Sequence, residues 1–166
     1  MNLVINSPAD RTDVLRGAVR DVRVQLSVLN HHVAARAGVK DADFDCLDLI
    51  SIHGPLSPGA LSKLAELHPA TLTGILDRLE SGGWIARERD PQDRRAVVVR
   101  VLPDRNAEVF ALYAGMNSRF DEVCADFSAD ELDVIAGFLE RVRAAGAAAA
   151  ADLRGADSEG ASQRSV

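Results

Sequence analysis

The central segment of the chain reads His68-Pro69-Ala70-Thr71-Leu72-Thr73-Gly74-Ile75-Leu76-Asp77-Arg78-Leu79-Glu80. Large apolar residues recur in it at spacings of three and four, which predicts a helix with one buried face: Leu72, Ile75, Leu76 and Leu79. Pro69 suits the first turn of that helix, because its missing N–H leaves no donor unpaired there. The opposite face carries small or short polar side chains, so the helix is slim enough to go deep into a groove.

A hairpin is predicted directly after this helix. Ser81-Gly82-Gly83 ends the helix, and two β-prone runs follow, from Trp84 to Arg89 and from Ala96 to Leu102. The loop that joins the two runs, Asp90 to Arg95, is polar and ends in two arginines. The sequence therefore predicts a helix followed at once by a hairpin with a basic tip.

A second short helix is predicted just before the central one. Ser57-Pro58 is a typical start, with a capping hydroxyl followed by a proline in the first turn, and the predicted buried side consists of Leu61, Leu64 and Leu67. The break between Leu64 and Pro69 is short, as a helix-turn-helix requires.

Residues 57–102 resemble the winged helix-turn-helix of the MarR family of bacterial transcription regulators. The resemblance rests on the Asp77-Arg78-Leu79-Glu80 ending of the central helix together with the Asp-x-Arg of the wing, Asp93 to Arg95. It implies a mainly α fold with a small β-wing, in which N- and C-terminal dimerisation helices flank the winged helix-turn-helix. The implied function is a repressor that binds a palindromic operator in double-stranded DNA as a homodimer and is released by a small-molecule effector. The alternative is a winged-helix interaction module that has lost operator binding.

The same resemblance implies a set of DNA contacts: Ser57, Pro69, Ala70, Thr71, Thr73, Gly74, Arg78, Asp93, Arg94 and Arg95. Arg95 matches the family's minor-groove arginine, with Asp93 holding its guanidinium and Arg94 nearer the phosphates. Two roles stay open for Arg78, which either touches phosphate or pairs with Glu80 or Asp77.

Gly74 departs from the family pattern, because many members carry a basic residue after the Thr-x-Thr. It reflects either a lost base contact or a close approach of the helix backbone to the bases.

Length and charge bound these expectations. A chain of 166 residues is about one domain, on the usual expectation of roughly 100 to 200 residues. The net charge of -6 argues mildly against nucleic-acid binding. The distribution matters more, because arginines outnumber the acids between residues 87 and 105: Arg87, Arg89, Arg94, Arg95, Arg100 and Arg105.

Long amphipathic helices are predicted on both sides of the central unit. The first runs from Asp10 to about Ala37, with an apolar stripe that has little of its own domain to cover it: Val14, Ala18, Val22, Leu26, Leu29 and Val33. A helix from about Ala42 to His53 follows, capped by Asp41 or Asp43, with Phe44, Leu47, Leu49 and Ile50 as core candidates. After the wing, one helix runs from Pro103 to about Phe127 and another, started by the capping box Ser128 to Glu131, runs to about Ala151.

These elements predict four parts of the chain. Residues 1–40 form an N-terminal dimerisation helix, 41–105 the winged helix-turn-helix, 106–151 the C-terminal dimerisation helices and 152–166 a disordered tail.

The remaining expectations concern ligands and location. The family's usual input is a small aromatic or phenolic effector between the first, second and fifth helices, where His31, His32 and His53 are candidate polar groups. We expect no metal, since the histidines fall on separate elements, no cofactor, and no enzyme activity, since no catalytic motif stands in a convincing context. Cys46 and Cys124 are interpreted as structural thiols. Without a signal peptide or a membrane span, the protein is expected in the cytoplasm.

Overall fold

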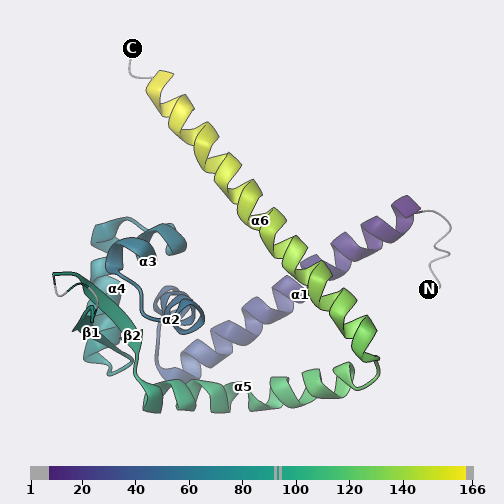
Figure 1. Cartoon of the computed structure of the whole chain (residues 1–166), viewed down its shortest axis with the longest axis horizontal. Coiled ribbons are helices and arrows are strands. Elements are labelled where there is room, and N and C mark those ends of the chain that lie inside the picture. The colour runs from purple at the N-terminus through teal and green to yellow at the C-terminus, as the bar shows by residue number, and fades with distance from the viewer. Residues whose placement is uncertain (1–7, 92, 94, 164–166) are drawn as a thin grey trace. The chain divides into compact units, whose positions relative to one another are not determined.

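The computed structural model describes residues 8–91, 93 and 95–163, and it is mainly helical with one two-stranded antiparallel sheet (Figure 1). In chain order its elements are α1 (Pro8–Ala37), α2 (Asp41–His53), α3 (Pro58–Ala65), α4 (Pro69–Ser81), β1 (Ile85–Arg89), β2 (Val97–Val101), α5 (Pro103–Cys124) and α6 (Ala129–Gln163). The expected mainly α fold with a small β-wing is confirmed. In these described ranges, no helix combines the length and the apolar character that crossing a bilayer would require.

The chain divides into two compact units, one up to Ala114 and the other from Gly115 onward. The first half of α5 belongs to the first unit for two reasons. Val109 is buried in the core of that unit. The hydroxyl of Tyr113 donates a hydrogen bond of 2.6 Å to Oδ1 of Asn30 in α1. The expected functional borders at residues 40, 105 and 151 stay predictions.

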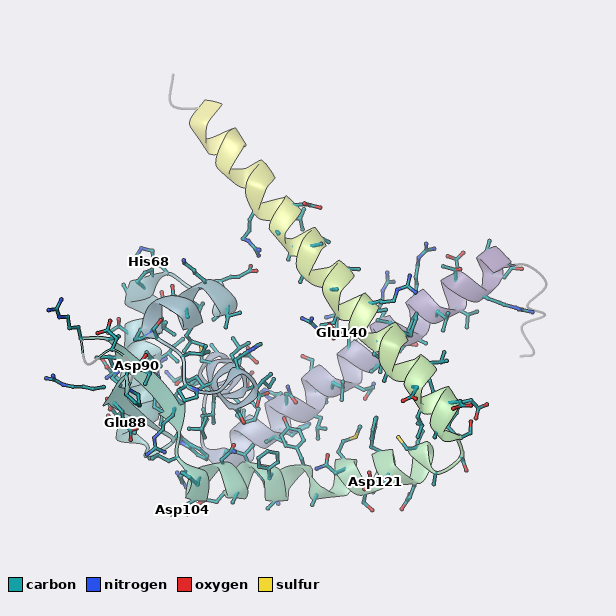
Figure 2. The ribbon with its side chains drawn as sticks, in the orientation of Figure 1. His68, Glu88, Asp90, Asp104, Asp121 and Glu140 are labelled. Carbon is teal, nitrogen blue, oxygen red and sulfur yellow. The ribbon has the colours of Figure 1, made fainter. Side chains whose placement is uncertain are left out.

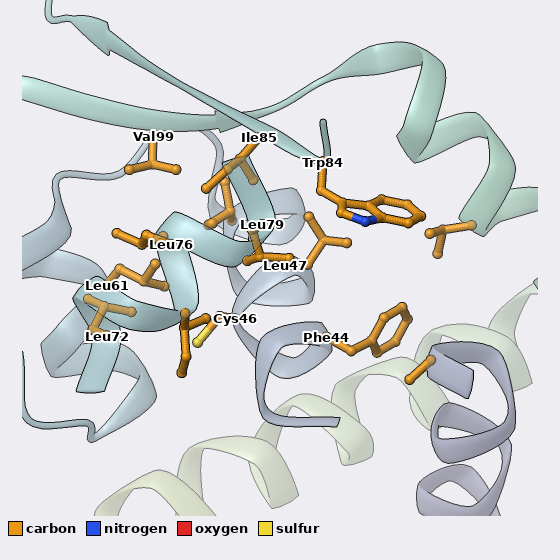
Figure 3. Packing of buried hydrophobic residues seen from close by; sticks show 14 of the residues in the cluster. Phe44, Cys46, Leu47, Leu61, Leu72, Leu76, Leu79, Trp84, Ile85 and Val99 are labelled. Carbon is orange, nitrogen blue, oxygen red and sulfur yellow. The ribbon is translucent and has the colours of Figure 1, made fainter. Parts of the chain in front are cut away.

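The core of the first unit forms where the predicted apolar faces meet (Figure 3). Helix α4 contributes the four residues of its predicted inner face, each at most 2% exposed: Leu72, Ile75, Leu76 and Leu79. Phe44, Leu47 and Ile50 of α2 are buried against them, whereas Leu49 is half-buried. Leu61, Trp84, Ile85 and Val99 complete the cluster, so the inner side of the helix-turn-helix is fixed by close packing.

The start of α3 and the turn that follows it match the sequence expectation. Oγ of Ser57 accepts a hydrogen bond of 3.2 Å from the backbone N–H of Ala60, which confirms the predicted cap. After α3, Glu66 adopts a left-handed conformation with φ 55°, and the Ser62 hydroxyl donates to the Leu67 carbonyl oxygen at 2.7 Å. The left-handed Glu66 and this hydrogen bond shape the short turn between the two helices. The prediction for Leu64 was wrong, because this side chain is 45% exposed.

The predicted cap of α2 was also wrong. The residue at the cap position is Lys40, which makes no capping hydrogen bond with its side chain. Asp41 instead contacts His31 of α1, and Asp43 binds Arg78 of α4. Both carboxylates therefore contact residues of other helices and do not cap α2.

The wing strands pair from Ile85 with Val101 to Arg89 with Val97, and Leu56 adds an isolated bridge to Val99. At the base of the wing, the guanidinium carbon of Arg105 lies 4.0 Å from the centre of the Trp84 ring. A Cβ at Gly82 would lie 2.8 Å from Cδ1 of this ring, so only glycine fits there without a shift. The joint between α4, the wing and α5 is closely packed.

The second unit consists of the end of α5 and all of α6. The capping box is confirmed, because Oε2 of Glu131 accepts from the backbone N–H of Ser128 at 2.9 Å and from its hydroxyl at 2.8 Å. Helix α5 ends at Cys124, before the expected Phe127. Helix α6 continues past the expected end at Ala151 to Gln163, since alanines up to that point favour helix and no proline stops it. Disorder of residues 152–166 stays a prediction, and 164–166 lie outside the described residues.

Candidate nucleic-acid interface

The outward face of α4 is narrow and accessible. Ala70, Thr71 and Thr73 are exposed and Gly74 is half-buried, while the leucine-rich face of the same helix is closed off in the core. His68 forms the N-cap, with Nδ1 accepting a hydrogen bond of 3.2 Å from the backbone N–H of Ala70 (Figure 2). Because Nδ1 is the acceptor, the ring of this cap carries its proton on Nε2. The sequence reasoning missed this cap, since histidine is not among the preferred capping residues.

The two threonines of this face differ in what they offer. The Thr73 hydroxyl donates to the carbonyl oxygen of Pro69 at 2.9 Å, so its donor is used within the helix. What remains outward are its methyl group and the lone pairs of its oxygen. Thr71 lies one position after Ala70, in the first turn of the exposed face.

Gly74 meets no steric barrier inside the chain. A Cβ at this position would lie 3.5 Å from Nη1 of Arg78, which is an ordinary van der Waals distance. Folding of this chain therefore does not require glycine here. Both explanations for the glycine, a lost contact and a close backbone approach, concern the outside of the helix.

Arg78 pairs with Asp43 of α2. The sequence had suggested Glu80 or Asp77 as its partner, and neither forms an ion pair with it among the described contacts. Nε of Arg78 donates to Oδ2 of Asp43 at 2.8 Å, and Nη2 donates to Oδ1 at 2.6 Å. Asp43 is 3% exposed, whereas the Arg78 side chain is about half exposed at 47%. The two parallel hydrogen bonds fix α4 against α2. Asp43 could not be predicted as the partner of Arg78, because no local sequence pattern relates two residues so far apart in the chain.

Asp77 and Glu80 bind Arg87 of β1 instead. Nη2 of Arg87 lies 2.7 Å from Oδ1 of Asp77, and Nη1 lies 2.7 Å from Oε2 of Glu80. On the strands themselves, Nη2 of Arg100 lies 2.7 Å from Oε1 of Glu88, and this hydrogen bond lowers the pKa of the Glu88 carboxyl. Acids on the same unit thus neutralise part of the predicted basic edge.

The tip of the wing carries exposed positive charge. Arg89 and Arg95 are exposed there, beside the exposed Asp93. The carboxylate of Asp93 accepts a hydrogen bond of 3.0 Å from the backbone N–H of Arg95. This contact shapes the loop. We had expected Asp93 to hold the Arg95 guanidinium, and among the described contacts it does not. Arg94 lies outside the described residues.

The three histidines proposed for an effector are not brought together. Nδ1 of His31 lies 2.9 Å from Oδ2 of Asp41 at the first residue of α2, and the ring of His32 is next to that of His31. His53 is the last residue of the same helix, ~18 Å further along its axis at about 1.5 Å per residue. One small ligand cannot contact all three. In the described part of the chain, no three His, Cys, Asp or Glu side chains gather as a metal site would need.

Cys46 is fully buried, and burial together with Asp45 and Asp43 raises the pKa of its thiol to about 11. Since the thiolate is the reactive form, this cysteine is held in its unreactive state at neutral pH.

Comparison with known proteins identifies the family. The MarR family profile matches residues 40–97. The uncharacterized HTH-type transcriptional regulator YcgE of Bacillus subtilis is 33% identical over 114 residues, which cover 68% of this chain and 74% of the relative. The chain belongs to the MarR family. It is accordingly a helix-turn-helix transcription regulator and not an enzyme.

Two further proteins are similar to this chain. The HTH-type transcriptional repressor YetL of Bacillus subtilis is 28% identical over 68% of both chains. The crystal structure of transcriptional regulator Tm0710 from Thermotoga maritima is 27% identical, with a TM-score of 0.58 over 79% of this chain and 92% of the other. In a MarR family regulator, α4 is the recognition helix, and the β1 and β2 hairpin is the wing.

Proposed function

We propose that this regulator represses transcription by binding a palindromic operator as a homodimer, and that a small-molecule effector releases it. The observation that carries the proposal is the pairing of a slim, exposed face on α4 with exposed arginines at the tip of the adjacent wing. A helix of this shape fits a major groove, and a wing arginine can enter the neighbouring minor groove.

The proposed contacts follow from this arrangement. Pro69, Ala70, Thr71, Thr73 and Gly74 face the major groove, with Thr73 offering its methyl group and oxygen lone pairs. Arg95 reads the shape of the minor groove, Asp93 sets the loop that presents it, and Arg94 contacts phosphate. Ser57, at the exposed start of α3, lies where a helix N-terminus can meet a phosphate. We propose that Arg78 acts by positioning α4 through Asp43.

The dimer is supported by apolar surface that the single chain leaves uncovered. On α1, large apolar side chains are at least 40% exposed along most of the helix: Val14, Leu15, Val22, Val24, Leu26 and Val28. In the second unit, Phe120, Val123, Val134 and Leu139 are each more than half exposed. Surfaces of this kind mark association sites, and a two-fold dimer reads two half-sites about one helical turn apart.

Repression and effector release have separate support. The relative YetL is named as a repressor. Release by an effector is what the family resemblance implies. Because His31 and His53 lie too far apart to contact one small ligand, the site for that effector is not the one that the histidines suggested.

Fluorescence anisotropy with labelled DNA from upstream of the protein's own gene tests the proposal. We expect saturable binding of one dimer per site that weakens steeply as salt rises, with much weaker binding to a shuffled duplex. Equal affinity for both duplexes, or no binding at low salt, would favour the alternative of an interaction module.

A further inference from the structure

A groove of about 360 Å³ lies in the first unit between α2 and α3. Its lining is mostly apolar and includes Leu49 and Ile52 of α2, Leu64 of α3 and Leu67 of the turn before α4. Ile52 is 74% exposed and Leu64 45% exposed, so neither side chain is covered within the chain. The volume lies in the range that holds small organic ligands, roughly 300 to 1,000 Å³.

Two carboxylates share this lining. Helix α2 carries four aspartates, and two of them have cationic or imidazole partners, since Asp41 contacts His31 and Asp43 binds Arg78. The other two, Asp45 and Asp48, both line the groove. Within the described part of the chain, no Lys, Arg or His forms an ion pair with either of them, and none lines the groove.

The spacing of Asp45 and Asp48 allows both to act on one ligand group. Residues three apart on a helix have Cβ atoms about 5–6 Å from each other, so one ammonium group can lie between the two carboxylates. The apolar side chains of Leu49, Ile52 and Leu64 are then left for the hydrophobic body of the same molecule.

We propose that this groove binds an amphipathic organic cation, an ammonium group on an aromatic or aliphatic body, with Asp45 and Asp48 receiving the charge. An anionic effector is excluded by the same two carboxylates, which would repel it at close range.

The electrostatics of the empty groove agree with this assignment. Burial raises the pKa of Asp45, helped by Asp41, and burial raises the pKa of Asp48, helped by Asp45. The charged form of both carboxylates is therefore disfavoured in the empty groove. A bound cation favours the charged form, so it stabilises each of these carboxylates more than it would stabilise a fully hydrated one.

The position of the groove ties the ligand to DNA binding. Leu64 and Leu67 flank the turn that sets α4, and this turn is held by the hydrogen bond from the Ser62 hydroxyl to the Leu67 carbonyl oxygen. A ligand wedged between α2 and α3 acts directly on the helix-turn-helix. This regulatory consequence rests on the proposed function, whereas cation binding itself does not.

Three probes of similar shape test the binding: 1-naphthylmethylammonium, 1-naphthylmethanol and 1-naphthoate. Isothermal titration of the full chain without DNA at pH 7 should show the ammonium binding about tenfold or more tightly than the alcohol, because a charge-assisted hydrogen bond adds to the shared apolar contact. Naphthoate should bind most weakly. Naphthoate binding as tightly as the ammonium, or no ammonium binding at millimolar concentration, overturns the proposal.

Variants assign the site. Asp45→Asn and Asp48→Asn should each weaken ammonium binding about tenfold and leave alcohol binding unchanged, whereas Ile52→Ser should weaken both. Asp121→Asn, which removes an exposed carboxylate outside the groove, is the control and should change neither. Parent-like ammonium binding by the two groove variants overturns the assignment. A loss of the dimer in either variant does so too, because the groove would then hold a second copy of the chain.

Anisotropy with upstream DNA tests the effect of the ligand on DNA binding separately from cation binding. The ammonium probe should weaken DNA binding by the parent and not by Asp45→Asn. If the probe binds and DNA affinity stays unchanged, the regulatory part of the inference is wrong. If the protein binds no upstream DNA, the proposed function fails, while the titrations still decide on the cation site.

Discussion

Asp43 of α2 and Arg78 of α4 form a two-point ion pair across the core, 2.8 Å from Nε to Oδ2 and 2.6 Å from Nη2 to Oδ1. The carboxylate is buried and the guanidinium is about half exposed. The two sides of the pair therefore depend on each other unequally. Arg78 can be hydrated without its partner, whereas Asp43 cannot.

This asymmetry predicts that Arg78→Met destabilises the protein more than Asp43→Asn does. The methionine variant leaves a buried carboxylate unpaired, and an unsatisfied buried polar group costs about 1–3 kcal/mol, more when it is charged. Urea unfolding followed by circular dichroism measures both variants. The double variant should recover part of the loss, because it removes the unpaired charge. Equal losses in the two single variants would show that the pair is not asymmetric.

Arg95→Ala should weaken binding to the upstream duplex by about 1–3 kcal/mol and leave thermal stability nearly unchanged. The side chain is exposed at the wing tip, where a charge contributes little to folding. Anisotropy titrations at several salt concentrations should also show a salt slope reduced by about one counterion. Arg36→Ala, an exposed arginine in the last turn of α1, is the matched control. Equal losses in both variants would mean that general charge, not the wing, binds DNA.

Gly74→Ala should stabilise the free protein by up to about 1 kcal/mol, since glycine inside a helix costs that much relative to alanine. The added methyl group meets Nη1 of Arg78 at 3.5 Å, so no clash offsets the gain.

The effect of the same position on DNA distinguishes the two explanations for glycine. If a base contact has been lost, Gly74→Ala leaves operator affinity unchanged, and Gly74→Arg tightens it and steepens the salt dependence by about one counterion. We expect this outcome, because Thr71, Thr73 and Arg95 remain to read the site. If the backbone approaches the bases, both variants bind more weakly despite normal folding.

Asp48→Asn should raise the stability of the ligand-free protein at neutral pH. Burial and Asp45 raise the pKa of Asp48 in the folded state, so its contribution to stability is present below the ordinary aspartate range and is lost as the pH rises through the folded pKa. Asparagine removes this loss, so the melting temperature of the variant should exceed that of the parent at pH 7. The difference should vanish at pH values below about 4. A variant less stable than the parent at pH 7 would show that the carboxylate supports the fold.

Val22→Asp should dissociate the proposed homodimer and leave the fold of each chain intact. Val22 is 57% exposed in the single chain, so the substitution opens no cavity, but it places a charge on the apolar surface of α1. Gln25→Asp adds a charge at an exposed polar position of the same helix and serves as the control. Sedimentation velocity measures both variants. An intact Val22→Asp dimer would place the subunit interface elsewhere.

Local patterns in the sequence predicted the parts of the molecule that depend on neighbouring residues. The inner face of α4 and the Ser128–Glu131 capping box rest on spacings of three or four residues, and the Ser57 cap rests on the adjacent pair Ser57-Pro58. All three are confirmed. The hairpin was predicted by its β-prone runs on either side of a polar loop, and β1 and β2 lie within those runs.

Pairing between distant residues could not be predicted in the same way. Asp43 was one of two candidates for the cap of α2, because aspartate is among the preferred capping residues. Its actual partner, Arg78, lies 35 residues further along the chain. The histidines were grouped as one effector site for their residue type alone. In the structure His31 lies beside the first residue of α2, whereas His53 is the last residue of that helix. The apolar surface of α1 is also broader than the predicted stripe, because Leu15, Val24 and Val28 add to it.

The packing of Trp84 beneath Arg105 gives the molecule a built-in optical reporter. Trp84 is the single tryptophan in the sequence, and it is buried where α4, the wing and α5 meet. A guanidinium 4.0 Å from the centre of the indole ring makes its emission sensitive to any opening of this joint. Movements of the wing can therefore be followed in the unlabelled protein, in stopped-flow mixing with DNA or ligand, without attaching a dye to the surface that is being studied.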